Sequence, residues 1–292
     1  MKNFMKLTIS IVNFNTDRYL SHLLKSLEDI KDEGSFEVYV VDNASTDNSL
    51  VLAKEKFQWV NFIESKINLG FAKAHNLVLK KIYSEYVLIL NPDTEITRDV
   101  LSYMINFMDK NPNVGAASCK VVLSDGSLDW AAHRGLPTPL ASLLYFLGHD
   151  SLYHLSGKPM DKPHEVDGIS GSFFLTRKSV LEKVGLFDED YFMYAEDLDL
   201  SMRIKQAGFK IMYVPEVHII HYKGVSSGLK KHSQKITTAD IETRKRSLDA
   251  FYLTMKIFYK KHLEGSYPFF INWIVYLAIN IKWFLAKREM VV

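Results

Sequence analysis

Cysteine and glycine-rich phosphate loops are what this sequence most clearly lacks. Its single cysteine is Cys119, which excludes an intrachain disulfide and favours a reducing compartment. No G-x-G-x-x-G follows the first apolar run, and no G-x-x-x-x-G-K-[ST] occurs anywhere. These absences argue against a dinucleotide-dependent dehydrogenase and against a P-loop phosphotransferase.

Net charge is also low, but it is unevenly distributed. The 292 residues carry a formal charge of +2, and 47% of them are hydrophobic, which is ample for a core. Residues 1–228 contain 24 Lys and Arg against 29 Asp and Glu, whereas residues 229–292 contain 12 against 5. The basic end points to an acidic surface, either anionic lipid or nucleic acid, with an ordinary solvated helix face as the alternative.

Apolar runs alternate with helical patterns through the first 123 residues. The expected strands are 7–14, 36–42, 59–63, 86–90 and 114–123, and the expected helices are 17–30, 46–56, 71–82 and 98–110. This alternation predicts an α/β fold with a Rossmann-like, largely parallel sheet and helices on both faces. Residues 124–166 contain four prolines and are expected to form an irregular, variable segment.

Three apolar runs end in clusters of acidic or amide side chains. They are EVYVVDNASTDN at 37–48, YVLILNPDTEI at 86–96 and YFMYAEDLDLSMR at 191–203. In an open α/β sheet, ligands bind in the crevice beyond the carboxyl ends of the strands. Asp42 and Asp93 both stand where such a strand would end, so the order of clusters suggests a site for a nucleotide, a metal and a proton acceptor.

The last part of the chain is expected to be helical, over 236–262 and 268–288. The second segment is apolar, but Asn272, Tyr276 and Asn280 form one polar stripe and Lys282 interrupts the rest. We therefore expect an interfacial rather than a spanning helix, with Trp273 and Trp283 as membrane anchors. The alternative is a helical pair packed on the catalytic part or on a second subunit.

Several stretches resemble the family 2 glycosyltransferases, inverting enzymes of the GT-A fold that use nucleotide-diphosphate sugars. The resemblance covers about residues 6–226 and rests on LTISIVNFN, VVDNASTDNS, NLGFAKAHN, LILNPDTEI, DGISGSFFLTRKSVLEKVGLFDE and YAEDLDLSMRIKQAGFKI. NPD in place of the usual Asp-x-Asp, together with NLGFAKAHN and the stretch from His221 to Ser226, is similar to the rhamnosyltransferase branch. That branch uses dTDP-rhamnose to build bacterial cell-surface polysaccharides.

The resemblance implies a set of donor-binding residues. Asp42 would accept from the imide N–H of the pyrimidine, and Val12 and Asn15 would line the base. The remaining residues expected at the nucleotide sugar are Asn43, Asn68, Gly70, Phe71, Asn76 and Asn91. A turn or N-cap role is the alternative for Asp42.

It also implies a divalent cation, Mg²⁺ or Mn²⁺, held by Asp93 and completed by His221. Asn91 stands where the family often has Asp, so the site has one charge less. A simple N-P-D-T turn is the alternative for Asp93, and a structural role for His221. His218 alternates in direction with His221 along a strand, so at most one of them faces the site.

Asp197 is the general base by resemblance, with Glu196 supporting it or contacting the acceptor. Spacing along a helix sends Glu196, Asp197 and Asp199 to different faces, and Asp199 is expected to be structural. Crowding of carboxylates raises one pKa, which suits a base. A solvated acidic helix N-terminus is the alternative.

These observations predict two regions: a GT-A catalytic domain at 1–228 and a basic helical extension at 229–292 that the catalytic part does not need for donor binding. The expected activity moves rhamnose from dTDP-rhamnose onto a lipid-linked saccharide. We expect a protein peripheral at the cytoplasmic membrane face, with no nucleic-acid partner and with a homo-oligomer allowed. The alternatives are a UDP-hexose or UDP-galactofuranose donor, and a non-catalytic nucleotide-sugar binding module.

Overall fold

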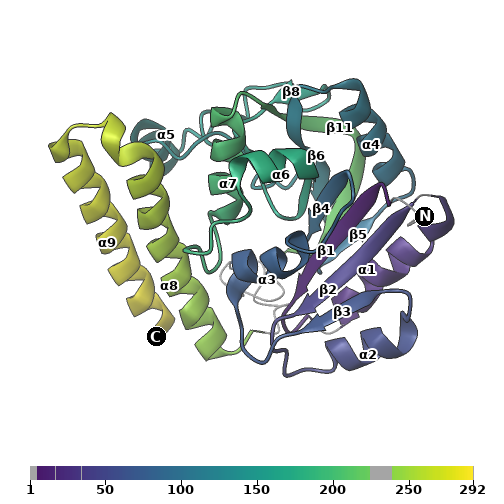
Figure 1. Cartoon of the computed structure of the whole chain (residues 1–292). Helices are drawn as coiled ribbons and strands as arrows, with labels where there is room; N and C mark the ends of the chain where they lie inside the picture. The colour runs from purple at the N-terminus through teal and green to yellow at the C-terminus, as the bar shows by residue number, and fades with distance from the viewer. Residues whose placement is uncertain (1–4, 17, 34, 224–238, 292) are drawn as a thin grey trace.

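A computed structural model of the chain describes residues 5–16, 18–33, 35–223 and 239–291 (Figure 1). The expected boundary at 228/229 and the end of the stretch from His221 to Ser226 lie outside these ranges.

The first half of the sheet is parallel, as the alternation predicted. Four strands pair side by side in the order β3-β2-β1-β4. Their bounds are Leu7–Asn13 for β1, Phe36–Asp42 for β2, Asn61–Glu64 for β3 and Tyr86–Leu90 for β4. The carboxyl ends of these strands therefore meet at one edge of the sheet, where the polar clusters begin.

The second half of the sheet is mixed. Strand β10, Phe173–Arg177, runs antiparallel to β4 and to β6, Val114–Leu123. Strand β11, Lys210–His221, runs parallel to β6 and antiparallel to two short strands, β5 at Thr94–Ile96 and β8 at His164–Glu165. This topology carries the end of β11 to the turn after β4, because His221 pairs with Thr94.

Helices cover both faces of the sheet (Figure 1). Their bounds are Arg18–Glu28 for α1, Ser49–Lys56 for α2, Gly70–Leu79 for α3, Val100–Lys110 for α4, Lys178–Val184 for α6 and Glu196–Gln206 for α7. Alternate residues of β4 enter opposite cores: Leu88 joins the core with α1 and α4, and Ile89 joins the core with α3, α6 and α7. A strand buried on both faces reads as the continuous apolar run YVLIL.

The segment 124–166 is more ordered than its prolines suggested. It contains strand β7, His133–Arg134, which pairs with β9, Gly168–Ile169, and helix α5, Pro139–Phe146. Thr138 caps α5, and its side chain accepts from the backbone N–H of Ala141 at 3.2 Å. Proline is compatible with the first turn of a helix, where its missing N–H costs nothing, so Pro139 starts a helix.

Residues 239–291, which belong to the expected C-terminal extension, form a helical hairpin beside the α/β part of the fold (Figure 1). Helix α8, Ile241–Phe258, continues through a π-helical turn at Tyr259–Leu263 and a 3₁₀ turn at Glu264–Ser266. Helix α9, Phe269–Val291, then returns along α8.

The polar stripe of α9 faces α8. Tyr259 donates to Asn272 at 2.6 Å, and Lys256 donates to Asn280 at 2.6 Å. Trp283 was expected to anchor in a membrane, but its indole N–H donates to Asp249 of α8 at 2.8 Å. The stripe and Trp283 therefore join the two helices to each other.

The hairpin also packs on the catalytic domain. Tyr191 lies just before α7 and Leu198 lies on it. Both belong to a small apolar cluster with Phe258, Tyr259 and Leu263 of the hairpin. Tyr191 is fully buried. The extension therefore covers apolar surface that the catalytic domain would otherwise expose.

Candidate active site

Asp42 ends β2 beside Asn13, the last residue of β1. One of its carboxylate oxygens accepts from the Asn13 amide at 2.8 Å, and the other accepts from the Ser45 backbone N–H at 3.0 Å. The contact with Ser45 closes a turn, so Asp42 makes the turn contact that was the alternative to a base-binding role. Each carboxylate oxygen has a second lone pair, which leaves room for a base N–H.

Asn15 connects the loop after β1 to the loop after β2. Its side-chain oxygen accepts from the Thr46 backbone N–H at 2.7 Å, and its own backbone is left-handed, with φ of 51°. Asparagine tolerates this conformation better than most residues. Val12 is buried in the core beneath this loop.

Asn43, Asn68 and Gly70 form a hydrogen-bonded loop at the start of α3. The Asn43 amide donates to Asn68 at 2.9 Å, and the Gly70 N–H donates to the same Asn68 oxygen at 2.9 Å. Gly70 has φ of +78°, and a Cβ there would lie 2.2 Å from the carbonyl oxygen of Phe192. Only glycine fits this position without displacement. The Phe71 N–H donates to that Phe192 carbonyl at 2.7 Å, so the predicted donor loop is joined to the segment that precedes α7.

Asn76 differs from the other predicted donor residues. It is buried, and its amide donates to the Phe187 carbonyl and to Glu189, both at 2.9 Å, while its oxygen accepts from the Phe187 N–H. These contacts saturate most of the hydrogen-bonding capacity of an amide. The structure thus assigns Asn76 to holding the loop before α7.

Asp93 and His221 lie side by side, as the sequence predicted. His221 Nε2 is 3.3 Å from Asp93 Oδ1, and His221 Nδ1 is 3.1 Å from Asp129 Oδ2. Lys223 in turn pairs with Asp129. His218 is exposed on the other side of β11, in agreement with the expected alternation. Asn91 is half-buried, and its backbone carbonyl accepts from Thr94 at 2.7 Å.

Both carboxylates act on the imidazole. Burial disfavours the charged ring, but Asp93 and Asp129 outweigh it and raise the pKa of His221 to about 9. Burial raises the pKa of Asp129. His221 and Lys223 outweigh this effect and hold the pKa of the carboxyl below its usual range.

The pair Asp93 and His221 is compatible with a divalent cation. Metal-ligating histidines commonly donate their second ring N–H to a carboxylate, and Asp129 occupies that position. The described ranges contain no group of three or more His, Cys, Asp or Glu side chains arranged to hold a metal. The protein would thus supply two ligands, and phosphate oxygens and water would complete the shell, which is the usual way in which Mg²⁺ is bound at diphosphates.

Asp197, the predicted general base, lies in the first turn of α7, directly after two residues with strained backbone. Tyr194 and Ala195 both have left-handed backbone conformations, with φ of 74° and 63°. Such residues cost on the order of 1–3 kcal/mol each and concentrate at functional sites. The turn delivers Glu196 and Asp197 into a buried environment, which differs from the solvated helix N-terminus considered as the alternative.

Asp197 is paired with Arg134 of β7. Arg134 Nη2 lies 3.4 Å from Oδ1 and 3.3 Å from Oδ2, and Oδ1 also accepts from the Leu198 N–H at 2.8 Å. Burial disfavours the charge on Arg134, but Asp197 outweighs it, so the pKa of the guanidinium lies above its ordinary value.

Glu196 has the opposite environment. It is fully enclosed, and its Oε2 has no hydrogen-bond partner among the described residues. Burial and the neighbouring Asp197 raise the pKa of Glu196 well above its usual range. Crowding was expected to raise one pKa in this cluster, and the group concerned is Glu196.

Asp199 contacts the C-terminal hairpin, which the sequence did not predict. Its carboxylate accepts from His262 Nε2 at 2.7 Å and from Arg203 Nε at 2.8 Å. Burial works against ionisation, but His262 and Arg203 outweigh it and lower the pKa of Asp199. Arg203 also donates to three carbonyls of the segment 184–186.

Asp129, Arg134 and His262 were not predicted from the sequence. Asp129 and Arg134 lie in the proline-containing segment, where no periodicity marks a buried charge. His262 lies in the extension, and its partner Asp199 is 63 residues away.

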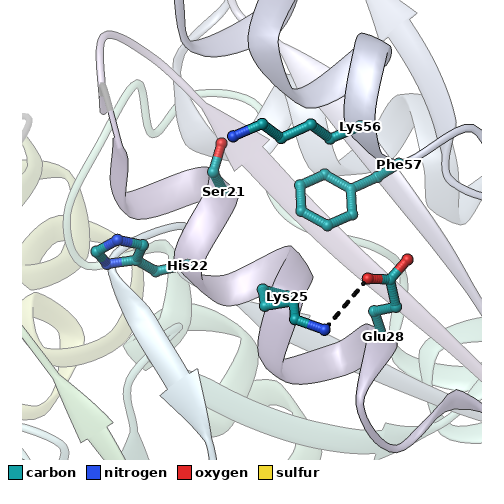
Figure 2. A pocket seen from close by; sticks show the side chains of 6 residues that line it. All are labelled: Ser21, His22, Lys25, Glu28, Lys56 and Phe57. Atoms are coloured by element: carbon teal, nitrogen blue, oxygen red, sulfur yellow. Dashed lines mark ion pairs between the residues drawn. The ribbon is translucent and has the colours of Figure 1, made fainter.

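A separate surface pocket of about 380 Å³ lies on α1 and at the end of α2 (Figure 2). It is lined by Ser21, His22, Lys25, Glu28, Lys56 and Phe57. None of these residues belongs to the site described above.

Comparisons with known proteins agree with this geometry. The chain is 28% identical over 242 residues to the N-acetylglucosaminyl-diphospho-decaprenol L-rhamnosyltransferase of Mycobacterium tuberculosis, covering 76% of this chain and 78% of the relative. It is 29% identical over 223 residues to the rhamnosyltransferase WbbL of Escherichia coli K12, covering 73% and 82%. Both are similar to this chain over most of its length.

The fold is shared with solved glycosyltransferases. The crystal structure of GalNAc-T7 with UDP, GalNAc and Mn²⁺ matches with a TM-score of 0.57 at 16% identity, over 85% of this chain and 48% of that one. This likeness confirms the GT-A architecture. The family model for glycosyl transferase family 2 matches residues 8–185, and the chain therefore belongs to glycosyl transferase family 2, with its resemblance to the rhamnosyltransferase branch confirmed.

Proposed function

We propose that this protein transfers rhamnose from dTDP-rhamnose, with inversion, to a lipid-linked saccharide in the synthesis of a bacterial cell-surface polysaccharide. The observations that support this most are Asp42 at the end of β2, the pair of Asp93 and His221 at the ends of β4 and β11, and the pair of Asp197 on α7 with Arg134. The names of the two relatives support the donor sugar and the class of acceptor.

In this proposal the thymine ring binds beside Asp42 and Asn15. The ring N–H donates to Asp42, which can only accept. The diphosphate lies toward the loop of Asn43, Asn68 and Gly70, where glycine lets the backbone come close. The backbone N–H of Phe71 donates to the carbonyl of Phe192, which joins this loop to the segment just before the proposed general base on α7.

Asp93 and His221 hold a divalent cation in this proposal, and Asp129 orients His221. When bound, Mg²⁺ or Mn²⁺ neutralises charge on the departing diphosphate. The Mn²⁺ named with the GalNAc-T7 structure supports this cation class.

Asp197 takes the proton of the acceptor hydroxyl while the hydroxyl oxygen attacks the anomeric carbon of the donor sugar. The bond from that carbon to the diphosphate oxygen breaks in the same displacement, so the configuration inverts. Arg134 orients Asp197 before the acceptor arrives. Glu196, with its raised pKa, is then a neutral neighbour that can hydrogen-bond to the acceptor.

The same proposal places the protein at the cytoplasmic face of the membrane, without a nucleic-acid partner. Among the described residues, α9 is the one helix long and apolar enough to cross a membrane, over Phe269–Met290, with 6% of that window buried. Its contacts to Tyr259 and Lys256 hold it lengthwise against α8, which supports contact along the surface. A homo-oligomer is compatible with this arrangement.

A UDP-hexose or UDP-galactofuranose donor is the second candidate, favoured by the UDP in the GalNAc-T7 structure. A non-catalytic binding module is less well supported, because such a module has no need for a buried Asp197 and Glu196 after a strained turn. The test is incubation with dTDP-rhamnose, UDP-glucose, UDP-N-acetylglucosamine and UDP-galactofuranose, each with Mg²⁺ or Mn²⁺. Preferential turnover of dTDP-rhamnose is expected, and turnover of a UDP-sugar alone would replace the donor assignment.

A further inference from the structure

Helix α5 is apolar and exposed. Its eight residues, PLASLLYF, contain no charge, and Ala141 is the one that is buried. Leu143 and Phe146 are each 56% exposed, and Leu140 and Leu147 are also exposed. An exposed cluster of this kind on a small helix marks a contact surface.

Helix α9 presents a second apolar row, opposite its polar stripe. Trp273 is 64% exposed, and the exposed residues recur in the i, i+3, i+4, i+7 pattern of one helix face: Phe270, Trp273, Ile274, Leu277, Ile281, Phe284 and Leu285. This spacing puts them on one face of a helix, while Asn272 and Asn280 bond to α8 on another.

The two apolar elements are neighbours in the fold, although more than a hundred residues separate them in the sequence. Helix α5 lies beside the hairpin (Figure 1). The ammonium of Lys282 on α9 lies over the ring of Phe146, 4.2 Å from its centroid. Arg288 lies over the ring of Phe284, 5.9 Å from the centroid.

We propose that α5 and the exposed row of α9 form one lipid-facing surface that rests on an anionic bilayer. The residues of this lipid-facing surface are Leu140, Leu143, Phe146 and Leu147 with the α9 row given above.

Charge favours a bilayer over a second copy of the chain. From Phe269 to Arg288, α9 contains Lys282, Lys287 and Arg288 and no acidic residue, and α5 contains no charge at all. Cations beside aromatic side chains suit the headgroup region of an anionic membrane. Lys287 is paired with Asp249 of α8, but two copies meeting through this face would still bring Lys282 and Arg288 of each copy together.

The proposal rests on the proposed function and adds a contact element to it. Helix α5 begins five residues after Arg134, the partner of Asp197. Contact of α5 with the bilayer would therefore hold Asp197, the proposed general base, close to the headgroups. A lipid-linked acceptor presents its sugar at that level.

Co-sedimentation with liposomes tests the role of α5. The variant is Leu143→Glu with Phe146→Glu, and the matched control is Val51→Glu on α2, where the side chain is 55% exposed. With vesicles of 70% phosphatidylcholine and 30% phosphatidylglycerol, we expect the α5 variant to lose about tenfold or more in partitioning, because two apolar contacts become charges. The control should bind like the wild type, and wild-type binding should weaken with salt.

Activity assays separate this proposal from the proposed function. Hydrolysis of donor in solution should be equal in the wild type and the α5 variant, whereas transfer to a lipid-linked acceptor in vesicles should fall with partitioning. Absence of any donor turnover in the wild type would count against the proposed function and leave the liposome result standing.

Two outcomes would overturn the proposal. In the first, the α5 variant partitions like the wild type while Trp273→Glu with Ile274→Glu on α9 does not. In the second, light scattering shows that the α5 variant converts a dimer to a monomer without changing partitioning, and the face is then an interface between copies. Circular dichroism of each variant establishes that it is folded.

Discussion

Arg134 contacts both carboxylate oxygens of Asp197, with Nη2 at 3.4 Å from Oδ1 and 3.3 Å from Oδ2. Five residues before it, Asp129 contacts His221 at 3.1 Å. One short segment therefore supports both the proposed cation ligand and the proposed base. In the proposed function, this shared segment would help to set the distance between the diphosphate and the proton acceptor, which is the positioning that a single displacement needs.

Removing the charge at Arg134 should reduce catalysis more than binding. In Arg134→Gln we expect kcat to fall by about 10²-fold, because Asp197 loses the charged partner that orients it. Arg134→Lys should recover part of the loss, since it retains the charge without the planar contact to both oxygens. Calorimetry with dTDP should show unchanged donor affinity. A large loss of dTDP affinity with unchanged kcat would place Arg134 at the donor instead.

Asp197→Asn and Glu196→Gln should differ sharply, although both replace a carboxyl with an amide. The amide at 197 cannot accept the proton, so we expect a loss of about 10²–10⁴ in kcat. The amide at 196 resembles the neutral carboxyl that burial and Asp197 favour, so its activity should remain within about tenfold. Single-turnover rates with saturating acceptor distinguish the two. Equal losses of kcat in the two variants would show that Asp197 and Glu196 do not have the separate roles proposed for them.

The cation ligands can be tested by binding alone. Asp93→Ala should abolish the Mn²⁺-dependent part of dTDP binding, because the diphosphate loses the cation held beside it. Asp129→Asn should weaken Mn²⁺ affinity by about 10–100-fold, since it alters the partner that orients His221. Calorimetry of dTDP with and without Mn²⁺ measures both. Metal-dependent affinity that survives in Asp93→Ala would move the ligand elsewhere.

Sequence patterns predicted the bounds of three strands of the sheet. Strands at 36–42, 86–90 and 114–123 have the expected bounds, because strands buried on both faces are continuous apolar runs that end in turn formers. The pair of Asp93 and His221 was also predicted, from the resemblance, and lies within 3.3 Å.

The contacts missed from the sequence involve pairs that no local pattern encodes. Arg134 and Asp197 are 63 residues apart, and so are Asp199 and His262. A buried ion pair needs one partner from each of two elements, and neither partner has a distinctive neighbourhood of its own. The prolines of residues 124–166 predicted an irregular segment, yet Pro139 begins helix α5, because proline favours both a turn and a first helical position.

Protonation of His75 should lower the stability of the fold as pH falls. The ring is fully buried, with Nδ1 2.8 Å from the Ser10 hydroxyl, and burial lowers its pKa from 6.5 to about 3. The unfolded chain therefore binds the proton first, so stability is lost as pH falls below 6.5 toward 3. We expect a loss of about 2 kcal/mol in the free energy of unfolding between pH 7.5 and pH 5 from this group.

Urea unfolding of the wild type and His75→Gln at the two pH values isolates that contribution. The glutamine does not titrate, so the pH difference in the variant should be smaller by about the same 2 kcal/mol. His133 is also buried, with its pKa lowered to about 4, and its contribution remains in both proteins. Identical pH differences would show that His75 is hydrated or already charged in the folded state.

The extension should be needed for a stable catalytic domain, contrary to its expected separability. His262 donates to buried Asp199 on the base helix, and Tyr191 and Leu198 are covered by Phe258 and Leu263. In His262→Ala the carboxylate loses one of its charged partners, so we expect the free energy of unfolding to fall by about 1–3 kcal/mol. His262→Gln, which can still donate, should recover part of this.

Lys261→Ala is the matched control at the neighbouring position, because its ion pairs with Asp188 and Asp190 are more exposed and such pairs contribute about 0–1 kcal/mol. Deletion of residues 229–292 should go further and expose Tyr191, giving a protein with reduced melting temperature and weakened transfer. Thermal unfolding and dTDP calorimetry check this. A truncated protein as stable as the full chain, with unchanged transfer to a soluble acceptor, would restore the view of the extension as a detachable membrane segment.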